Sequence, residues 1–163
     1  MRFRFAEEKD CALILDFIRA LADYEKMSEQ VVATEALLRE WIFEKKKAEV
    51  LFVCEGEEAV GFALFFHNFS TFLGRAGVYL EDLFVRPAHR GKGYGKAMLE
   101  KLAQIAVERG CGRLEWACLD WNRPSIDFYL SLGAAPMDAW TTYRLTGDTL
   151  NEAAKQAELL TER

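Results

Sequence analysis

The fold is decided by residues 78–102, which read VYLEDLFVRPAHRGKGYGKAMLEKL. The first eight of these residues are mostly apolar and predict a strand, and a turn containing Pro87 follows. Three alternating glycines (Gly91, Gly93, Gly95) then lead directly into a segment whose apolar residues recur at helical spacing as far as Ala106. The stretch therefore predicts a strand, a glycine-rich turn and a helix in immediate succession.

The start of such a helix is suited to bind an anion. The first N–H groups of a helix have no partner inside it, and the positive end of the helix dipole lies behind them. Glycines before the helix let a ligand approach the backbone closely. We therefore predict an anion cradle for a phosphate or pyrophosphate, with the Arg90 side chain as a charged partner. The cradle consists of Arg90, Gly91, Lys92, Gly93, Tyr94, Gly95 and Lys96.

Two better-known glycine motifs match this turn less well. A P-loop needs a serine or threonine after Gly95-Lys96 to bind magnesium, and Ala97 stands there. A dinucleotide-binding motif has its glycines immediately after the strand, whereas residues 86–90 intervene here. Asp120, at the end of the next predicted strand, keeps the dinucleotide alternative open.

Composition favours one soluble domain. The 163 residues, of which 51% are hydrophobic, are enough for one full core. No apolar run reaches the length of a membrane span, and the N-terminal MRFRFAEEKD lacks a secretion signal, so we expect a cytoplasmic protein without a membrane partner. The net charge of -5 argues against nucleic acid and favours a cationic partner. Four cysteines without a C-x-x-C pair predict buried, reduced thiols and no metal.

Hydrophobic periodicity predicts the remaining elements. Helices are expected at 7–23, 34–45, 94–109, 122–132 and about 149–160, and strands at 2–6, 50–54, 59–66, 78–85, 113–120 and 136–145. The strand-helix-strand unit around the cradle should join parallel neighbours in the sheet. A glycine-bearing loop is expected at 68–77, and the aromatic cluster Phe66, Phe69 and Phe72 either packs inside or lines a substrate mouth or a subunit contact.

Arg90-x-x-Gly93-x-Gly95, placed between a strand and a helix, resembles the acetyl-coenzyme A motif of the GNAT superfamily of N-acetyltransferases. Further blocks resemble its diamine (spermidine/spermine) and thialysine acetyltransferase branch. These blocks are LADYEKM at 21–27, YLEDLFV at 79–85, WNRPSIDFY at 121–129 and Gly133-Ala134. Together they cover most of the chain. The resemblance implies an α/β fold with a central mixed, largely antiparallel sheet flanked by helices, one domain over residues 1–163, and a homodimer.

The resemblance also assigns roles along the cofactor strand. In the family, this strand pairs its backbone with the pantetheine arm of acetyl-CoA, which by position implies Leu83, Phe84 and Val85. The N–H of Leu83 or Phe84 would bind the thioester oxygen, and losing such a donor typically adds about 3 to 4 kcal/mol to a barrier. Asn122 would bind the pantetheine arm or cap its own helix.

Two further residues are candidates for the proton transfers. A primary amine near pKa 10 is protonated at neutral pH, so a carboxylate must bind the cation and accept or relay its proton. Glu81 matches the family's residue in this role, acting directly or through a water, with Asp82 expected on the opposite face of the strand. Tyr129 matches the tyrosine at the cofactor sulfur, where it would donate to the departing thiolate or only pack against the cofactor.

Tyr24 and Glu25 match the substrate contacts of the diamine branch, with Glu81 at the reacting end. Two separated carboxylates suit a molecule that bears two positive charges. The branch also carries Glu-Gly-Trp near its C-terminal strand, where this chain has Thr141-Thr142-Tyr143. A thialysine-like or other diamino compound is therefore as open as a polyamine.

The sequence thus predicts an acetyl-CoA-dependent N-acetyltransferase that acts on a small cationic amine by direct transfer in a ternary complex. An acyl-enzyme is not expected, because Ser125 has no nearby histidine and Cys118 lies in an apolar pattern. Two alternatives stay open: a protein lysine or N-terminal acetyltransferase, and a module that senses coenzyme A without turnover.

Overall fold

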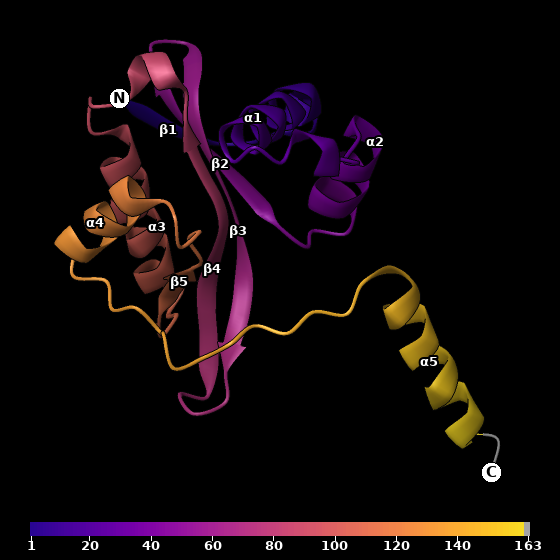
Figure 1. Ribbon diagram of the computed structural model, residues 1–163. Helices are drawn as coiled ribbons and strands as arrows, with labels where there is room; N and C mark the ends of the chain where they lie inside the picture. The colour runs from indigo at the N-terminus through magenta and orange to yellow at the C-terminus, as the bar shows by residue number, and fades with distance from the viewer. Residues whose placement is uncertain (162–163) are drawn as a thin grey trace. The chain divides into compact units, whose positions relative to one another are not determined.

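The first part of the chain forms a five-stranded sheet. Its strands lie in the order β1-β2-β3-β4-β5 (Figure 1). The computed structural model describes residues 1–161, and side chains as far as residue 157. The chain divides into one compact unit over Met1–Ala117 and a second that begins at Cys118. The prediction that all 163 residues form one domain stays a prediction, and each unit is described by itself.

The first unit has the predicted mixed sheet. Its strands are β1 (Arg2–Phe5), β2 (Glu49–Glu55), β3 (Glu58–Ser70), β4 (Arg75–Val85) and β5 (Leu114–Trp116). Pairing is antiparallel from β1 to β4 and parallel between β4 and β5. Helix α3 (Tyr94–Glu108) makes the crossover between the two parallel strands, as predicted.

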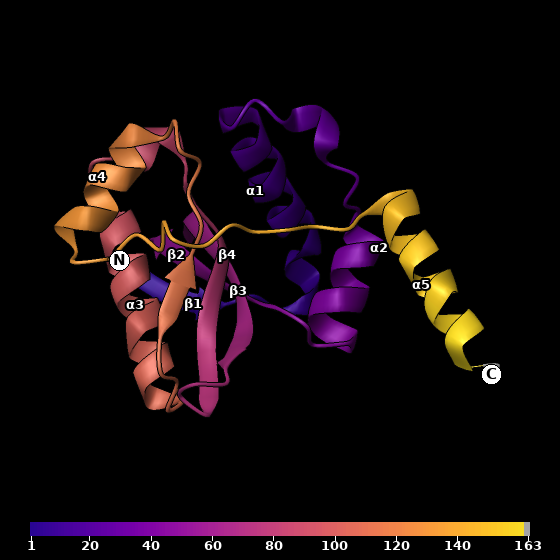
Figure 2. The same ribbon diagram turned by 60° about the horizontal axis from the view of Figure 1, so that its bottom comes forward.

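Helices cover both faces of this sheet. Figures 1 and 2 show α1 (Cys11–Tyr24) and α2 (Glu35–Leu38) on one face and α3 on the other. The 3-10 helix η1 (Glu8–Asp10) leads into α1, and the π-helix η3 (Arg39–Glu44) continues α2, so the predicted helix at 34–45 changes its winding halfway.

Aromatic side chains form much of the core between α1 and the sheet. Phe17 of α1 packs on Phe62 of β3 and Phe52 of β2, with ring centroids 5.1 Å and 5.8 Å apart. The Arg4 guanidinium lies over the Phe52 ring. It also binds both carboxylate oxygens of Asp10, at 2.7 and 2.9 Å. This pair joins the first strand to the start of α1.

The predicted loop at 68–77 is wrong. Strand β3 continues to Ser70 and β4 begins at Arg75, which leaves a tight turn with Gly74 in the left-handed region at φ 65°. The aromatic residues at this hairpin tip are not core residues, because Phe69 is 63% exposed and Phe72 is 98% exposed. Phe66, by contrast, packs on Tyr79 of β4 with centroids 5.2 Å apart.

Two predicted strands are also corrected. Strand β5 covers Leu114–Trp116 rather than 113–120, because its ladder with β4 includes only Val78–Leu80. The predicted strand at 136–145 is wrong, since these residues are irregular in the described chain. Alternating side chains favour a strand only where a neighbouring strand completes the ladder.

The second unit consists of α4 (Arg123–Ser131) and α5 (Gly147–Thr161) with the irregular segment between them. Both helices were predicted within about two residues of their ends. Among the described residues, no helix is long and apolar enough to cross a membrane. Of the four cysteines, Cys11 and Cys54 are buried, and Cys111 and Cys118 are half-buried.

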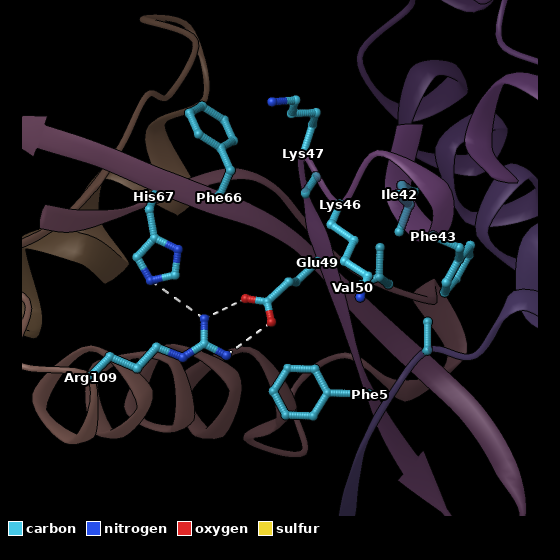
Figure 3. Close-up of a pocket in the computed structure, with 12 residues that line it drawn as sticks. Phe5, Ile42, Phe43, Lys46, Lys47, Glu49, Val50, Phe66, His67 and Arg109 are labelled. Carbon is cyan, nitrogen blue, oxygen red and sulfur yellow. Dashed lines mark hydrogen bonds and ion pairs between the residues drawn. The ribbon is translucent and has the colours of Figure 1, made fainter. Parts of the chain in front are cut away.

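An ion pair fixes the C-terminal end of α3 to the sheet (Figure 3). Arg109 binds both carboxylate oxygens of Glu49 on β2, one of them at 2.9 Å, and its guanidinium also lies against the Phe65 ring at 5.8 Å. The pair lies in a groove of about 690 Å³ that contains none of the predicted site residues. The Glu49–Arg109 pair holds the C-terminal end of α3, and the other end of this helix forms the predicted cradle.

We expect Arg109→Gln to lower the free energy of unfolding by about 1 to 2 kcal/mol, because a two-point charged contact is lost. Denaturant titration measures this difference. Lys101→Gln on the same helix removes a charge whose one contact is Gln104 on the helix surface, and it should change stability by less than half as much. Equal stability of the two variants would show that the Glu49 pair does not anchor α3.

Candidate functional site

The structure has the predicted strand, glycine turn and helix start where the anion cradle was predicted. After β4 ends at Val85, the chain forms the 3-10 helix η4 (Pro87–His89) and a turn in which Gly91 and Gly93 have φ of 77° and 85°. Gly93 is the N-cap and supplies no side chain to the helix end. The first N–H group bonded back within this helix start belongs to Ala97, which donates to the Gly93 carbonyl at 3.0 Å.

The cradle has room for a ligand. A Cβ atom added at Gly91 or Gly93 would meet no atom within 4 Å, so the backbone there faces open space. N–H groups at the start of a 15-residue helix and an open glycine backbone are what a diphosphate requires. The residues present therefore fit the diphosphate of coenzyme A.

The Arg90 side chain lies over two aromatic rings. Its Nε donates to the Val85 carbonyl at 3.0 Å, and its guanidinium lies 4.6 Å from the centroid of Tyr24 and 5.2 Å from that of Phe84. Tyr24 and Phe84 also contact each other edge to face, with centroids 6.4 Å apart. The structure thus brings together a predicted cofactor-binding arginine and a predicted substrate-binding tyrosine.

The second half of β4 has one open edge in the described first unit. β3 pairs with β4 along its whole length, including Leu83, Phe84 and Val85, whereas β5 pairs only with Val78–Leu80. The β5-side edge beyond Leu80 therefore carries no strand. An extended amide chain such as pantetheine could bond there, which is the position that the resemblance implies.

Strand β4 contains a β-bulge at Glu81. Phe65 of β3 faces Leu80, and the next residue, Leu64, faces Asp82, so Glu81 is an extra residue without a partner. Leu80 and Asp82 consequently lie on opposite faces of the sheet, although they are two residues apart. Simple alternation, on which the expected opposition of Glu81 and Asp82 rested, does not hold here.

Two carboxylates, Glu81 and Glu25, lie within electrostatic range of Asp82. Burial, and then the negative charges of Glu81 and Glu25, together raise the pKa of Asp82 to about 6. Burial also raises the pKa of Glu25, which directly follows α1. The structure therefore brings the predicted residues Glu25 and Glu81 to Asp82, which sequence reasoning had placed away from the site. The bulge at Glu81 changes the face on which Asp82 lies. It depends on the pairing with β3, so the local sequence of β4 gives no sign of it.

This acidic group favours a cation. Among the described residues, no set of three or more His, Cys, Asp and Glu side chains could hold a metal ion. Tyr24 is partly exposed and adds an aromatic surface next to Glu25. Carboxylates and an aromatic ring are the groups that bind an organic ammonium ion.

The second unit carries Asn122 and Tyr129. Asn122 is buried and caps α4, with its side-chain oxygen accepting the Ser125 N–H at 3.4 Å, so the capping interpretation is confirmed. Tyr129 is half-buried on α4, next to Phe128 with ring centroids 5.4 Å apart. The roles of both residues toward a cofactor stay predictions.

Comparison with known proteins shows the family of the chain. Residues 14–134 match the model of the acetyltransferase (GNAT) family. The chain is 39% identical to the thialysine N-epsilon-acetyltransferase of Bos taurus and 37% identical to that of Sus scrofa, each over 93% of this chain and 95% of the relative. An integron cassette protein from V. cholerae superposes with a TM-score of 0.80 at 28% identity, over 94% of this chain and 97% of that one.

We expect Gly93→Ala to weaken coenzyme A binding at least tenfold, because its Cβ would enter the space where the diphosphate should lie. Gly110→Ala is a matched control: Gly110 also has a positive φ, of 69°, and open space, but lies at the other end of α3. Both variants should lose about 1 kcal/mol of stability through backbone strain. Calorimetry should show weakened binding in Gly93→Ala alone; equal affinities would contradict the cradle.

Asp82 should make the protein less stable as pH rises from about 4 to 6. The unfolded carboxyl loses its proton near its ordinary pKa of 3.8 and the folded one near 6, so the folded state binds more protons between these values. Above pH 6 the ionised side chain should cost up to about 3 kcal/mol.

Asp82→Asn should therefore raise the free energy of unfolding at pH 7 to 8 and flatten its decline above pH 4. Urea titrations at several pH values measure both effects. Asp23→Asn, at an exposed position of α1, should leave the decline as it is. A decline that persists in Asp82→Asn would contradict the assignment to Asp82.

Proposed function

The chain belongs to the acetyltransferase (GNAT) family and is an N-acetyltransferase; on this premise we propose that it acetylates a primary amine of a small cationic diamine or diamino acid. The acetyl donor that the family implies is acetyl-CoA. The proposed reaction is direct attack of the amine on the thioester in a ternary complex. A thialysine-like diamino acid is the preferred substrate class, in keeping with the names of the bovine and porcine relatives.

The observation that carries this proposal is the carboxylate group formed by Glu25, Glu81 and Asp82. Burial raises the pKa of Asp82, and the negative charges of Glu81 and Glu25 raise it as well. A bound ammonium ion removes this repulsion, so the free energy stored in the group favours a cation. Three carboxylates can balance more than one positive charge, which supports a diamino compound over a simple amine.

Each remaining requirement of the reaction has a proposed residue. The cradle N–H groups and Arg90 hold the diphosphate, and the open edge of β4 pairs with the pantetheine arm. Bound acetyl-CoA supplies the reactive thioester. The N–H of Leu83 or Phe84 donates to the carbonyl oxygen, where charge develops in the transition state.

The amine must lose a proton before it attacks. Glu81 accepts this proton directly or through a water, while Glu25 and Asp82 balance the remaining charge of the substrate. Tyr129 donates a hydrogen bond or a proton to the departing thiolate.

The proposal also includes a homodimer, and sedimentation measurements test this oligomeric state.

An amine panel assayed for thiol release tests the substrate class. The panel contains putrescine, spermidine, lysine, thialysine and a histone-like peptide. The proposal expects the highest kcat/KM for a small diamino compound, with thialysine among the best. A clear preference for the peptide would instead indicate a protein acetyltransferase. Coenzyme A binding without turnover of any amine would indicate a sensor.

We expect Glu81→Gln and Tyr129→Phe each to lower kcat by about a hundredfold or more, the usual range for a lost general base or acid. Coenzyme A affinity should remain within about twofold, because neither side chain is proposed to hold the diphosphate. Glu108→Gln and Tyr143→Phe alter exposed residues in the same chemical way and should leave kcat unchanged. Full activity of Glu81→Gln would remove Glu81 from the mechanism.

A further inference from the structure

One carboxylate outside the predicted site contacts three residues of the cradle turn. Glu55 is the last residue of β2, and its side chain reaches across to the turn before α3. The Lys92 ammonium lies 3.4 Å from both of its oxygens, and the Tyr94 hydroxyl is hydrogen-bonded to it. His89 Nδ1 approaches one oxygen at 2.9 Å, outside hydrogen-bond geometry.

These contacts add to those that hold the segment between β4 and α3. At its start the Arg86 N–H donates to the Val60 carbonyl of β3, and Arg90 bonds to Val85 and lies over Tyr24 and Phe84. Its other backbone bonds are short-range, from the His89 N–H to the Arg86 carbonyl and from the Arg90 N–H to the Pro87 carbonyl. Gly91 and Gly93 both follow, and glycine has more backbone freedom to lose than any other residue. A contact from outside the turn is therefore needed to keep its N–H groups aimed at one point.

The Tyr94 contact joins Glu55 to the first turn of α3. Tyr94 is the first residue of α3 and is buried, and its hydroxyl is the main reason why the pKa of Glu55 is lowered. Its ring also contacts the His89 ring, with centroids 6.4 Å apart. Glu55 thus joins η4, the glycine turn and the first turn of α3 to the end of the β2–β3 hairpin.

We propose that Glu55 is a positioning residue that holds the cradle in its diphosphate-binding shape before the cofactor arrives. This inference rests on the proposed function, because it takes coenzyme A as the ligand of the cradle. Glu55 touches neither substrate; it acts through Lys92 and Tyr94. Ordering the turn in advance removes part of the entropy that binding would otherwise cost.

The negative charge of Glu55 has an opposite effect that must be weighed. A carboxylate near the cradle repels a diphosphate, and this repulsion alone would make its removal tighten binding. Lys92 compensates the charge at 3.4 Å, and the Tyr94 hydrogen bond disperses it further. The paired carboxylate therefore presents little net charge to the ligand, and the ordering effect dominates.

Coenzyme A titration by calorimetry, with Glu55→Ala, Glu55→Gln and the wild type, tests the inference. Glu55→Ala should weaken binding about five- to tenfold, as expected for the loss of a hydrogen bond that leaves a buried hydroxyl without its partner. Glu55→Gln keeps an acceptor for Tyr94, so its coenzyme A affinity should fall between those of Glu55→Ala and the wild type. Glu58→Gln removes the same charge from the same hairpin and should bind within about twofold of wild type.

Steady-state kinetics separate positioning from a general structural defect. Glu55→Ala should raise KM for acetyl-CoA while KM for the amine stays unchanged. Amide hydrogen exchange of the unliganded protein is the second measurement. The N–H groups of Arg90 and Ala97, which are bonded on either side of the glycines, should exchange faster in Glu55→Ala, while those of the β2–β3 ladder should not.

The outcomes are distinct. Unchanged or tighter coenzyme A binding in Glu55→Ala, or unchanged exchange at Arg90 and Ala97, overturns the role of Glu55. Failure of the wild type to bind coenzyme A overturns the proposed function instead, and the exchange comparison then decides alone whether Glu55 holds the turn.

Discussion

The site depends on the unpaired N–H groups at the start of α3, because no side chain caps this helix. A helix start without a capping side chain is unfavourable by itself, and here the N-cap is a glycine with a left-handed φ. The rest of the first unit compensates for this. Buried residues of α3 pack on the sheet, the Glu49–Arg109 pair holds its far end, and Glu55 holds the turn before it. An anion at the helix start would supply the partners that the sequence omits.

The acidic group follows the same logic with the opposite charge. Asp82 is ionised at neutral pH although burial and two neighbouring carboxylates oppose it. A structure selected only for stability would place an uncharged residue there. The anionic cradle ligand and the cationic amine would thus each relieve an unfavourable feature of the free protein. In both places, binding affinity would come from electrostatic free energy that folding has already stored.

Sequence reasoning succeeded where the signal is local and failed where it depends on a partner strand. The glycines at 91, 93 and 95 and the apolar period of α3 lie within one short stretch, so the turn and the helix start could be predicted. The bulge at Glu81 depends on how β3 pairs with β4, and it alone brings Asp82 to Glu25. The prediction of a strand at 136–145 was wrong for a related reason. Alternating side chains indicate that a segment could form a strand, but they do not show which neighbouring strand it would pair with.

Strand β4 connects the proposed amine site to the proposed cofactor site. The bulge with Glu81 and Asp82 lies in its second half, and the cradle begins directly after its last residue, Val85. In a strand, four residues span about 14 Å, and hydrogen bonds to β3 keep that length rigid. The two carboxylates of β4 that are proposed to bind the amine and the turn that is proposed to bind the cofactor are therefore held at a fixed separation by the ladder with β3. For a reaction that needs two substrates in line, a rigid strand is a better support than two independent loops, because small errors in position are costly.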